Sequence, residues 1–298
     1  MIKLPDEYNN KVINRYGIKG RAWLEKIDLI IDKYIKKFDL TNVLLANDLS
    51  INVVLFADSK KYGKVILKVL APTLVSINEI NYMKMCSDNF FAKCYFYDKE
   101  DRVMLLEKLM PGYPLSKVDN QNERIDIFCY IMNGIVNDSL SIKGFKTLDD
   151  TFKERFNYAL NHKEEYVYIY NEINYAISVY EDIKRMNLPK YVLHDDLHHK
   201  NILKVENGWK VIDPHGIVGE RVFETAQFIR SELSLSSLNY LDLVVSKVSE
   251  KLNEQKTLIY KALYVYLISK VIFHVKIKHN LGKILKNIEI CEKIKIYL

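Results

Sequence analysis

The sequence predicts an α+β fold with two lobes, a small N-terminal lobe built on an antiparallel sheet and a larger, mainly helical C-terminal lobe. Short segments of strand composition gather in the first 110 residues, and helical periodicity prevails from about residue 119. Between these regions stands Pro111-Gly112, a pair that strongly favours the end of a strand. We therefore expect two domains, residues 1–110 and residues 111–298.

The first lobe is expected to hold a leading helix and a sheet. Apolar residues recur at helical spacing from residue 20 to residue 37, and polar residues then break the pattern. Farther along, two apolar segments flank a turn that contains Gly63, which predicts a hairpin. The expected elements are a helix at 20–37, hairpin strands at 51–57 and 64–70, a helix at 76–86, and strands at 92–97 and 103–109.

The second lobe is expected to be helical, with one insertion. The helical pattern ends in two helices at about 238–252 and 257–276. Residues 191–212 return to short strands, and Asn207-Gly208 within them is a hairpin signal. The sequence thus predicts a helical lobe that carries a β-hairpin.

The composition is that of a globular chain, with 49% hydrophobic and 28% charged residues. The N-terminus lacks the apolar stretch of a signal peptide, and charges interrupt every apolar run well before about 20 residues. The four cysteines stand far apart and form no C-x-x-C pair, which is typical of reduced thiols. We expect a cytoplasmic protein without a membrane segment.

The net charge of +6 is unevenly distributed along the chain. From Lys251 to the C-terminus, ten lysines stand against three glutamates. Such an end could contact nucleic acid, but lysines on the solvated faces of terminal helices are the favoured explanation of the pattern. We expect no nucleic-acid partner.

The segment from Tyr191 to Leu203 contains the spacing H-x-D-x-x-x-x-N. Phosphoryl transfer needs a carboxylate that orients the attacking hydroxyl and accepts its proton, and a neutral oxygen ligand for the metal. Asp196 and Asn201 supply both groups. Asp195 is the competing aspartate, but Asn201 follows Asp196 by five positions, so the spacing selects Asp196 as the catalytic base.

A second oxygen ligand for a metal is expected at Asp213. The predicted hairpin carries the chain from Asn201 to Asp213, which would place the two side chains side by side. Mg²⁺ takes few protein ligands and completes its shell with phosphates and water, so this pair suffices.

The histidines of the segment have a simpler interpretation than metal binding. His194 is expected to hold the loop through hydrogen bonds of its ring. His198 and His199 could suggest a transition metal, but no other residues stand at ligand spacing to support one.

Five residues of the first lobe are candidates for binding the nucleotide. Lys68 stands between aliphatic residues on one strand face and is expected to contact phosphates, with Glu79 as its ion-pair partner. Glu107 and Leu109 end the last strand of the lobe, where backbone groups would meet the nucleotide base. Ser50 could donate one hydrogen bond to a phosphate.

Taken together, these segments resemble the aminoglycoside phosphotransferase superfamily, which has a protein-kinase-like fold, and most closely its streptomycin 6-phosphotransferase and hydroxyurea phosphotransferase group. The resemblance runs from Gly20 to beyond residue 230, and its most specific piece is the segment 209–220 together with Arg230. It implies ATP-dependent O-phosphorylation with Asp196 as the base, Asn201 and Asp213 on Mg²⁺, and Lys68 on phosphate. Antibiotic resistance is the implied biological role.

The chain departs from that group at several positions. Asp195 and Lys200 stand where glycines are common, and Glu224 stands where an aspartate is common. Asp195 is tolerable at negative φ, and at positive φ aspartate is among the residues penalised least. The expected nucleotide-covering turn, residues 47–52, contains no glycine.

The acceptor is expected to be a small molecule with a hydroxyl group. Between Asp119 and Asp182, twelve acidic residues stand against six basic ones, which suits a cationic antibiotic but also a solvated acidic helix pair. The resemblance favours streptomycin-like aminocyclitols, and fructosamine-, choline- or methylthioribose-type acceptors are the alternative. ATP is the expected donor with GTP as the alternative, and we expect a monomer or weak dimer.

Two other classes fit less well. A protein kinase would show a glycine-rich loop and an A-P-E segment, and neither is visible. A nucleotide-binding pseudokinase would have lost its acidic pair, whereas Asp196, Asn201 and Asp213 are all present.

Overall fold

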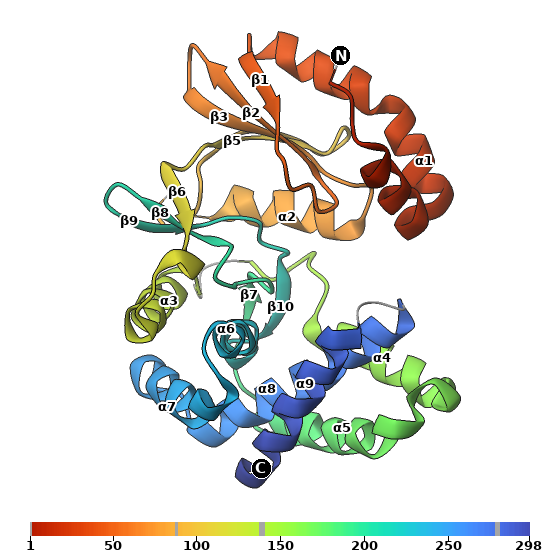
Figure 1. Cartoon of the computed structure of the whole chain (residues 1–298), viewed down its shortest axis with the longest axis vertical. Helices are drawn as coiled ribbons and strands as arrows, with labels where there is room; N and C mark the ends of the chain where they lie inside the picture. The colour runs from red at the N-terminus through yellow and green to blue at the C-terminus, as the bar shows by residue number, and fades with distance from the viewer. Residues whose placement is uncertain (1, 87–88, 137–140, 278–280) are drawn as a thin grey trace. The chain divides into compact units, whose positions relative to one another are not determined.

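The computed structural model describes residues 2–86, 89–136, 141–277 and 281–298 (Figure 1). It divides the chain into two compact units. Unit 1 comprises residues 1–113 and 204–215, and unit 2 comprises residues 114–203 and 216–298. The α+β fold class is confirmed, because unit 1 carries an antiparallel sheet and unit 2 is mainly helical. The domain division after residue 110 stays a prediction.

Unit 1 begins with a long helix, α1 (Asp6–Lys37), which starts earlier than the predicted helix at 20–37. The helix continues across Gly17, the one residue inside it with a non-helical backbone (φ +57°). Glycine adopts this conformation without the Cβ penalty that other residues incur. Tyr8, Trp23 and Tyr34 of α1 are buried in the core of the unit, so both halves of the helix pack.

The sheet of unit 1 has five antiparallel strands in the order β1-β2-β3-β5-β4. Four of them match predicted strands, and β1 was missed because Asn42, with φ +51°, interrupts its short pattern. A helix, α2 (Leu74–Met85), follows β3 as expected. The strands are β1 (Thr41–Leu45), β2 (Val53–Ser59), β3 (Gly63–Val69), β4 (Cys94–Asp98) and β5 (Val103–Glu107).

A second, smaller sheet has three strands, one from residues 111–114 and two from residues 202–211. Its order is β6-β8-β9, from β6 (Pro111–Pro114), β8 (Ile202–Val205) and β9 (Gly208–Val211). The predicted hairpin is therefore present as β8 and β9. Val211 exchanges backbone hydrogen bonds with Phe90 and Ala92, which ties the hairpin to the segment before β4.

Unit 2 is built around the apolar helix α8 (Lys256–Lys276), which contacts five neighbouring helices, α4, α5, α6, α7 and α9. α8 is long and apolar enough to cross a bilayer, but 72% of its most apolar stretch is buried, as in the core helix of a folded domain. The final helix, α9, had no counterpart among the predicted elements. The other helices are α3 (Gln121–Ile135), α4 (Leu148–Asn161), α5 (Tyr170–Arg185), α6 (Val222–Leu235), α7 (Leu241–Leu252) and α9 (Leu281–Ile294). Short 3₁₀ helices are η1 (Leu115–Lys117), η2 (Lys163–Ile169), η3 (Leu238–Tyr240) and η4 (Lys295–Tyr297).

Two short antiparallel strands, β7 (Lys190–Leu193) and β10 (Ile217–Glu220), pair within unit 2. All four residues of β10 are buried, and β10 also contacts α4 and α6. The residue after β7 is His194, so this pair supports the start of the predicted catalytic loop.

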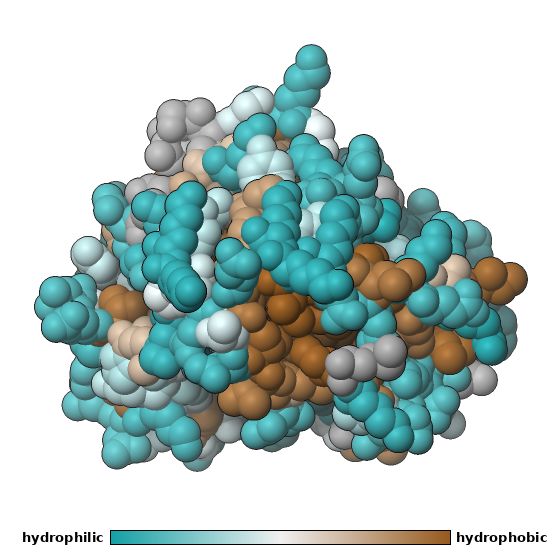
Figure 2. Space-filling model, turned by 90° about the horizontal axis from the view of Figure 1, so that it is seen from above, coloured by the Kyte–Doolittle hydropathy of each residue, from teal (hydrophilic) through white to brown (hydrophobic). Residues whose placement is uncertain are grey.

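The surface carries some exposed apolar side chains. Figure 2, a view from above Figure 1, shows a mostly hydrophilic surface that surrounds an apolar area. Strongly exposed apolar residues of α1 and β1 include Ile18, Leu29 and Leu44.

We expect Gly219→Ala to destabilise the protein by about 1–3 kcal/mol, the usual cost of overpacking. A Cβ at Gly219 of β10 would lie 2.4 Å from Cδ1 and 2.9 Å from Cγ of Leu148, the first residue of α4. Urea unfolding of Gly219→Ala, Leu148→Ala and the double variant measures the effect. If the clash with Leu148 is the cause, the free energy of unfolding falls less in the double variant than the sum of the decreases in the two single variants. Additive decreases would contradict this explanation.

Candidate active site

The polar centre of unit 1 is the side chain of Lys68 on β3. Its ammonium donates to Oε1 of Glu79 on α2 at 2.5 Å and to Oδ1 of Asp213 at 2.7 Å. Lys68 is 2% exposed and Glu79 is 5% exposed, so the lysine lies inside the unit. Two carboxylates from distant parts of the sequence thus hold one ammonium in place.

The charge of Lys68 is maintained by these two partners. Burial by itself would lower the pKa of Lys68, but the Asp213 and Glu79 carboxylates outweigh burial and the net pKa is raised. The side chain is therefore a fixed cation at neutral pH, as an interaction with phosphate requires.

Asp213 stands two residues after β9 with a left-handed backbone (φ +61°). Its side chain is 46% exposed, unlike those of Lys68 and Glu79. A carboxylate has about four lone-pair sites, so accepting a hydrogen bond from Lys68 leaves capacity for a metal ion.

In unit 2, the predicted catalytic loop is held by side-chain amides. Oδ1 of Asp196 accepts a hydrogen bond from Nε2 of Gln227 at 3.1 Å, and Oδ2 accepts one from Nδ2 of Asn201 at 3.2 Å. Nδ2 of Asn201 also donates to the backbone oxygen of Asp196 at 3.0 Å. Because these bonds fix the nitrogen side of the Asn201 amide, its oxygen is the end available as a hard ligand.

Gln227 is itself held from the core helix. The hydroxyl of Tyr266 on α8 donates to Oε1 of Gln227 on α6. This bond directs the Gln227 nitrogen toward Asp196 and links α8 to the carboxylate through one amide. The sequence analysis did not identify either residue, although a glutamine between Ala226 and Phe228 in an apolar helix is a usable signal.

The start of the loop is bound by Glu224, a fully buried residue of α6. Oε2 of Glu224 accepts from the backbone N–H of His194 at 2.6 Å, and Oε1 accepts from that of Asp195 at 3.1 Å. Asp195 has φ +62°, the left-handed conformation that explains why glycine is common here. The ring Nδ1 of His194 accepts from the N–H of Asp196 at 3.3 Å, so His194 holds the loop as expected.

Burial raises the pKa of Glu224 to about 8, and the charges of Asp195 and Asp196 add to the increase. The two backbone N–H groups act in the opposite direction, but they do not compensate for desolvation. Glu224 is therefore largely protonated at pH 7.

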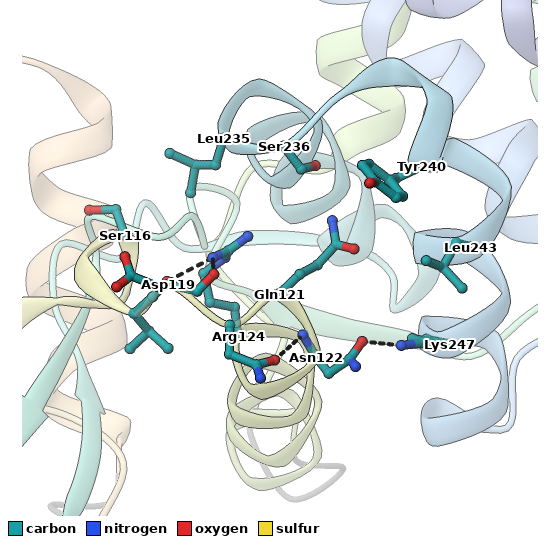
Figure 3. A pocket seen from close by; sticks show the side chains of 12 residues that line it. Ser116, Asp119, Gln121, Asn122, Arg124, Leu235, Ser236, Tyr240, Leu243 and Lys247 are labelled. Carbon is teal, nitrogen blue, oxygen red and sulfur yellow. Dashed lines mark hydrogen bonds between the residues drawn. The ribbon is translucent and has the colours of Figure 1, made fainter.

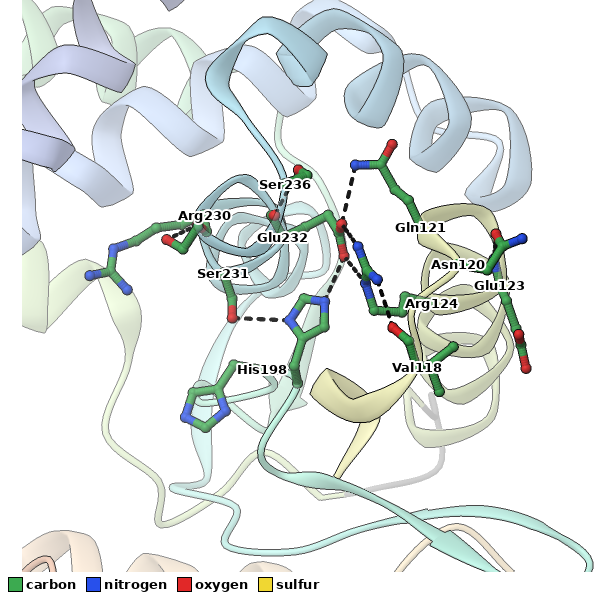
Figure 4. A network of polar contacts seen from close by, with 12 residues as sticks. Val118, Asn120, Gln121, Glu123, Arg124, His198, Arg230, Ser231, Glu232 and Ser236 are labelled. Carbon is green, nitrogen blue, oxygen red and sulfur yellow. Dashed lines mark hydrogen bonds and ion pairs between the residues drawn. The ribbon is translucent and has the colours of Figure 1, made fainter. Parts of the chain in front are cut away.

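The later part of the loop is anchored by a buried ion pair (Figure 4). Nε2 of His199 lies 2.7 Å from Oε2 of Glu232 on α6, and Arg124 on α3 binds the same carboxylate through Nε at 2.9 Å and Nη2 at 2.5 Å. Burial lowers the pKa of His199, so the neutral ring donates from Nε2 and its Nδ1 accepts from the hydroxyl of Ser231. The imidazole also stacks on Phe228 with ring centroids 4.5 Å apart. His199 is thus a structural residue of the loop.

The same arginine borders a surface hollow of about 630 Å³ between η1, α3, α6 and α7 (Figure 3). Nη1 of Arg124 donates to the backbone oxygens of Val118 and Asp119 at its rim. Asn122 and Lys247 are hydrogen-bonded to each other across the opening. The hollow is polar and open to solvent.

The remaining predicted nucleotide-binding residues lie in unit 1. Ser50 is exposed in the segment between β1 and β2. Glu107 binds Nζ of Lys210 at 2.9 Å and the N–H of Lys93 at 3.0 Å, so its side chain connects β5 to the hairpin. Leu109 is 5% exposed. Their roles toward a nucleotide stay predictions.

The structure brings the predicted residues together in two groups. Lys68, Glu79 and Asp213 form one cluster in unit 1. Asp196 and Asn201 form the other in unit 2. The expected proximity of Asn201 and Asp213 joins the two units and stays a prediction. Among the described residues, no group of three or more His, Cys, Asp or Glu side chains has the geometry of a metal site.

Comparison with known proteins adds independent information. The family model for aminoglycoside/hydroxyurea antibiotic resistance kinases matches residues 44–240. A streptomycin 3''-kinase of Klebsiella pneumoniae is 52% identical over 44 residues, 14% of this chain and only 16% of that kinase. A streptomycin 6-kinase of Streptomyces griseus is 23% identical over 229 residues, 75% of this chain and 73% of that kinase.

A solved structure supports the fold over nearly the whole chain. The choline kinase LicA from Streptococcus pneumoniae superposes with a TM-score of 0.68 at 13% identity, covering 92% of this chain and 98% of its own. LicA has also been solved in complex with AMP. At this level of identity the likeness shows the fold alone.

We expect Glu232→Ala to destabilise the protein by about 3–5 kcal/mol, because it leaves Arg124 buried without its carboxylate. The matched control is Glu154→Ala, which removes a carboxylate that is 62% exposed and pairs with Lys146. Exposed ion pairs of this kind contribute little. Chemical denaturation of both variants gives the comparison, and equal losses would show that the buried pair does not anchor the loop.

The raised pKa of Glu224 predicts that the stability of the protein depends on pH. Its pKa of about 8 in the folded protein exceeds the value of about 4.3 expected for an unfolded chain, so wild-type stability falls as pH rises through this interval. Glu224→Gln does not titrate. We therefore expect the stability of Glu224→Gln relative to wild type to increase between pH 5 and pH 8, measured by urea unfolding at several pH values. A difference that stays constant with pH would contradict the assignment.

Proposed function

This chain belongs to the aminoglycoside/hydroxyurea antibiotic resistance kinase family and is a small-molecule phosphotransferase, and from that premise we propose that it transfers the γ-phosphoryl group of ATP to a hydroxyl group. The observation that carries the proposal is the environment of Asp196. Two side-chain amides orient its two carboxylate oxygens, as a group that receives a proton from a hydroxyl requires.

Asp196 is proposed as the base and not Asp195. The backbone N–H of Asp195 is held by Glu224, and its left-handed backbone makes it the turning point of the loop. Asp196 instead has its carboxylate fixed by Gln227 and Asn201. The geometry within unit 2 therefore agrees with the H-x-D-x-x-x-x-N spacing.

Mg²⁺ is proposed as the metal, with Asn201 and Asp213 as its protein ligands. The donor set fits, because an amide oxygen and a half-exposed carboxylate are hard oxygen ligands. When bound, the metal neutralises charge on the transferring phosphates. Lys68, kept cationic by Glu79 and Asp213, is proposed to bind the nucleotide phosphates, with Ser50, Glu107 and Leu109 as further nucleotide contacts.

Two acceptor classes are considered. The similarity to streptomycin kinases supports a streptomycin-like aminocyclitol and a role in antibiotic resistance. The alternative is a hydroxyl of another small metabolite, which is compatible with the choline-kinase fold. A pseudokinase is less well supported, because Asp196 and Asn201 are both held in defined positions. We propose a cytoplasmic monomer or weak dimer.

The first test is a coupled assay of nucleoside diphosphate release with Mg²⁺ and either ATP or GTP. Streptomycin, hydroxyurea, choline and other small hydroxyl compounds serve as acceptors. Release that depends on one acceptor supports the phosphotransferase proposal and assigns its class. Nucleotide binding without release in the presence of any acceptor would favour the pseudokinase.

We expect Asp196→Asn to lower kcat by about 10²–10⁴-fold while nucleotide affinity changes little, because the base acts only in the chemical step. Asp195→Asn is the matched control and is expected to retain activity within about tenfold. Steady-state kinetics and nucleotide titration check both values. If Asp195→Asn loses the activity and Asp196→Asn keeps it, the assignment of the base is wrong.

A further inference from the structure

The amide of Gln227 connects the core helix of unit 2 to the proposed base. Its Nε2 donates to Oδ1 of Asp196 at 3.1 Å, and its Oε1 accepts from the hydroxyl of Tyr266. Gln227 is 8% exposed and Tyr266 is 3% exposed, so both contacts lie inside the unit. Three side chains, from α8, α6 and the loop after β7, thus form one hydrogen-bonded series.

Gln227 is the member of this series that fixes Asp196 relative to the helices. The other carboxylate oxygen, Oδ2, accepts from Nδ2 of Asn201 at 3.2 Å. Asn201 follows Asp196 by only five residues, so this second bond belongs to the loop itself and moves with it. The bond from Gln227 comes from α6 and ties the carboxylate to the helical part of unit 2.

The direction of the series is determined by the chemistry of its two ends. An ionised carboxylate only accepts hydrogen bonds, so Asp196 requires the nitrogen of the Gln227 amide and not its oxygen. The reversed amide would place Oε1 of Gln227 against Oδ1 of Asp196, and two acceptors would then face each other. Because the amide oxygen must point toward α8, a donor is required there, and the phenol of Tyr266 supplies it.

The hydroxyl of Tyr266 keeps the proton that it donates. Burial raises the pKa of Tyr266 well above its usual value, and the charges of Asp195 and Asp196 act in the same direction. The charges of Arg230 and Arg155 act in the opposite direction but do not reverse the shift. The donor at the α8 end is therefore present at neutral pH.

Tyr266 is the only donor to Oε1 of Gln227 among the residues that the structure describes. The terminal torsion of a glutamine is broad and roughly two-fold, so the side chain itself does not choose between the two amide orientations. Without the phenol, this buried oxygen would lack its partner, and rotation of the amide to relieve the loss would break the bond to Asp196. The hydroxyl on α8 therefore decides where the Gln227 nitrogen points.

We propose that Tyr266 is a positioning residue for phosphoryl transfer, which through Gln227 holds the carboxylate of Asp196 in the orientation that receives the proton of the acceptor hydroxyl. The inference rests on the proposed phosphotransferase function and deepens it. In that step, the hydroxyl oxygen forms a bond to the γ-phosphorus, its proton moves to Asp196, and the bond from the γ-phosphorus to the leaving nucleoside diphosphate breaks. A general base acts only within hydrogen-bond reach of the proton, so a displaced carboxylate slows this step.

A purely structural role of Tyr266 is the competing explanation, and α8 offers a matched control. Tyr260 lies on the same helix, is 1% exposed, and donates its hydroxyl to Oδ1 of Asp242 on α7 at 2.7 Å. Tyr260→Phe therefore removes a comparable hydroxyl from the same helix without touching the series. If the Tyr266 hydroxyl served only folding, Tyr266→Phe and Tyr260→Phe would lower the melting temperature and leave kcat unchanged.

The first experiment measures steady-state kinetics, nucleotide affinity and melting temperature of four variants: Tyr266→Phe, Gln227→Met, their double variant and Tyr260→Phe. We expect Tyr266→Phe to lower kcat about tenfold and Gln227→Met to lower it about 10–10²-fold, with KM and nucleotide affinity within about twofold of wild type. Tyr260→Phe is expected to keep the wild-type kcat within about twofold, since its hydroxyl has no path to Asp196.

The double variant tests whether Tyr266 acts through Gln227. If it does, Tyr266→Phe has no further effect once the amide is gone, and the kcat of the double variant equals that of Gln227→Met within about twofold. Losses of kcat that multiply in the double variant would overturn the proposal. A wild-type kcat in Tyr266→Phe would overturn it as well.

The second experiment detects the contact without turnover. The chain has three glutamines, Gln121, Gln227 and Gln255, so ¹⁵N labelling of glutamine side chains gives three amide signals. The signal of Gln227 is the one that disappears in Gln227→Met. We expect Tyr266→Phe to shift this signal and to speed the exchange of its protons with solvent, and Tyr260→Phe to leave it unchanged. An unchanged signal in Tyr266→Phe would overturn the proposal.

Failure of the inference and failure of the proposed function give different results. An active wild type with full kcat in Tyr266→Phe would overturn the positioning role alone. A wild type that releases no nucleoside diphosphate with any acceptor would overturn the phosphotransferase function, even where the Gln227 signal responds to Tyr266→Phe.

Discussion

The hydrogen bonds from one face of α6 to the loop that begins at His194 are the interactions on which the candidate active site of unit 2 depends. Glu224, Gln227 and Ser231 recur on α6 at intervals of three and four residues, so they share a face. They bind the loop at its start, at Asp196 and at His199, and Glu232 reinforces the last contact. The loop contains a left-handed residue and little regular structure, so these side chains supply the order that backbone pairing does not.

Buried cations receive carboxylate partners in both units. In unit 1, the buried ammonium of Lys68 receives two carboxylates, which keep it charged. In unit 2, Arg124 is similarly matched by Glu232, whose pKa of about 2 reflects hydrogen bonds from Arg124 and His199 that outweigh burial.

Family membership and local chemistry answer different questions about this protein. The family establishes that this chain is a small-molecule phosphotransferase, and one fold can carry the same chemistry for many acceptors. Names of relatives therefore indicate the reaction better than they indicate the substrate.

The sequence by itself determined the fold class, most strands of unit 1, the hairpin and the spacing that selects Asp196 and Asn201, because periodicity and short motifs are local properties. It also selected the pairing of Lys68 with Glu79, which lie eleven residues apart. It missed β1, α9 and the first part of α1; Asn42 interrupts the pattern of β1, and Gly17 interrupts that of α1. Only the tertiary structure decided that Gln227, Glu224 and Glu232 hold the loop, since each acts on a partner about 30 residues away. Such contacts depend on how helices pack, and no local pattern encodes them.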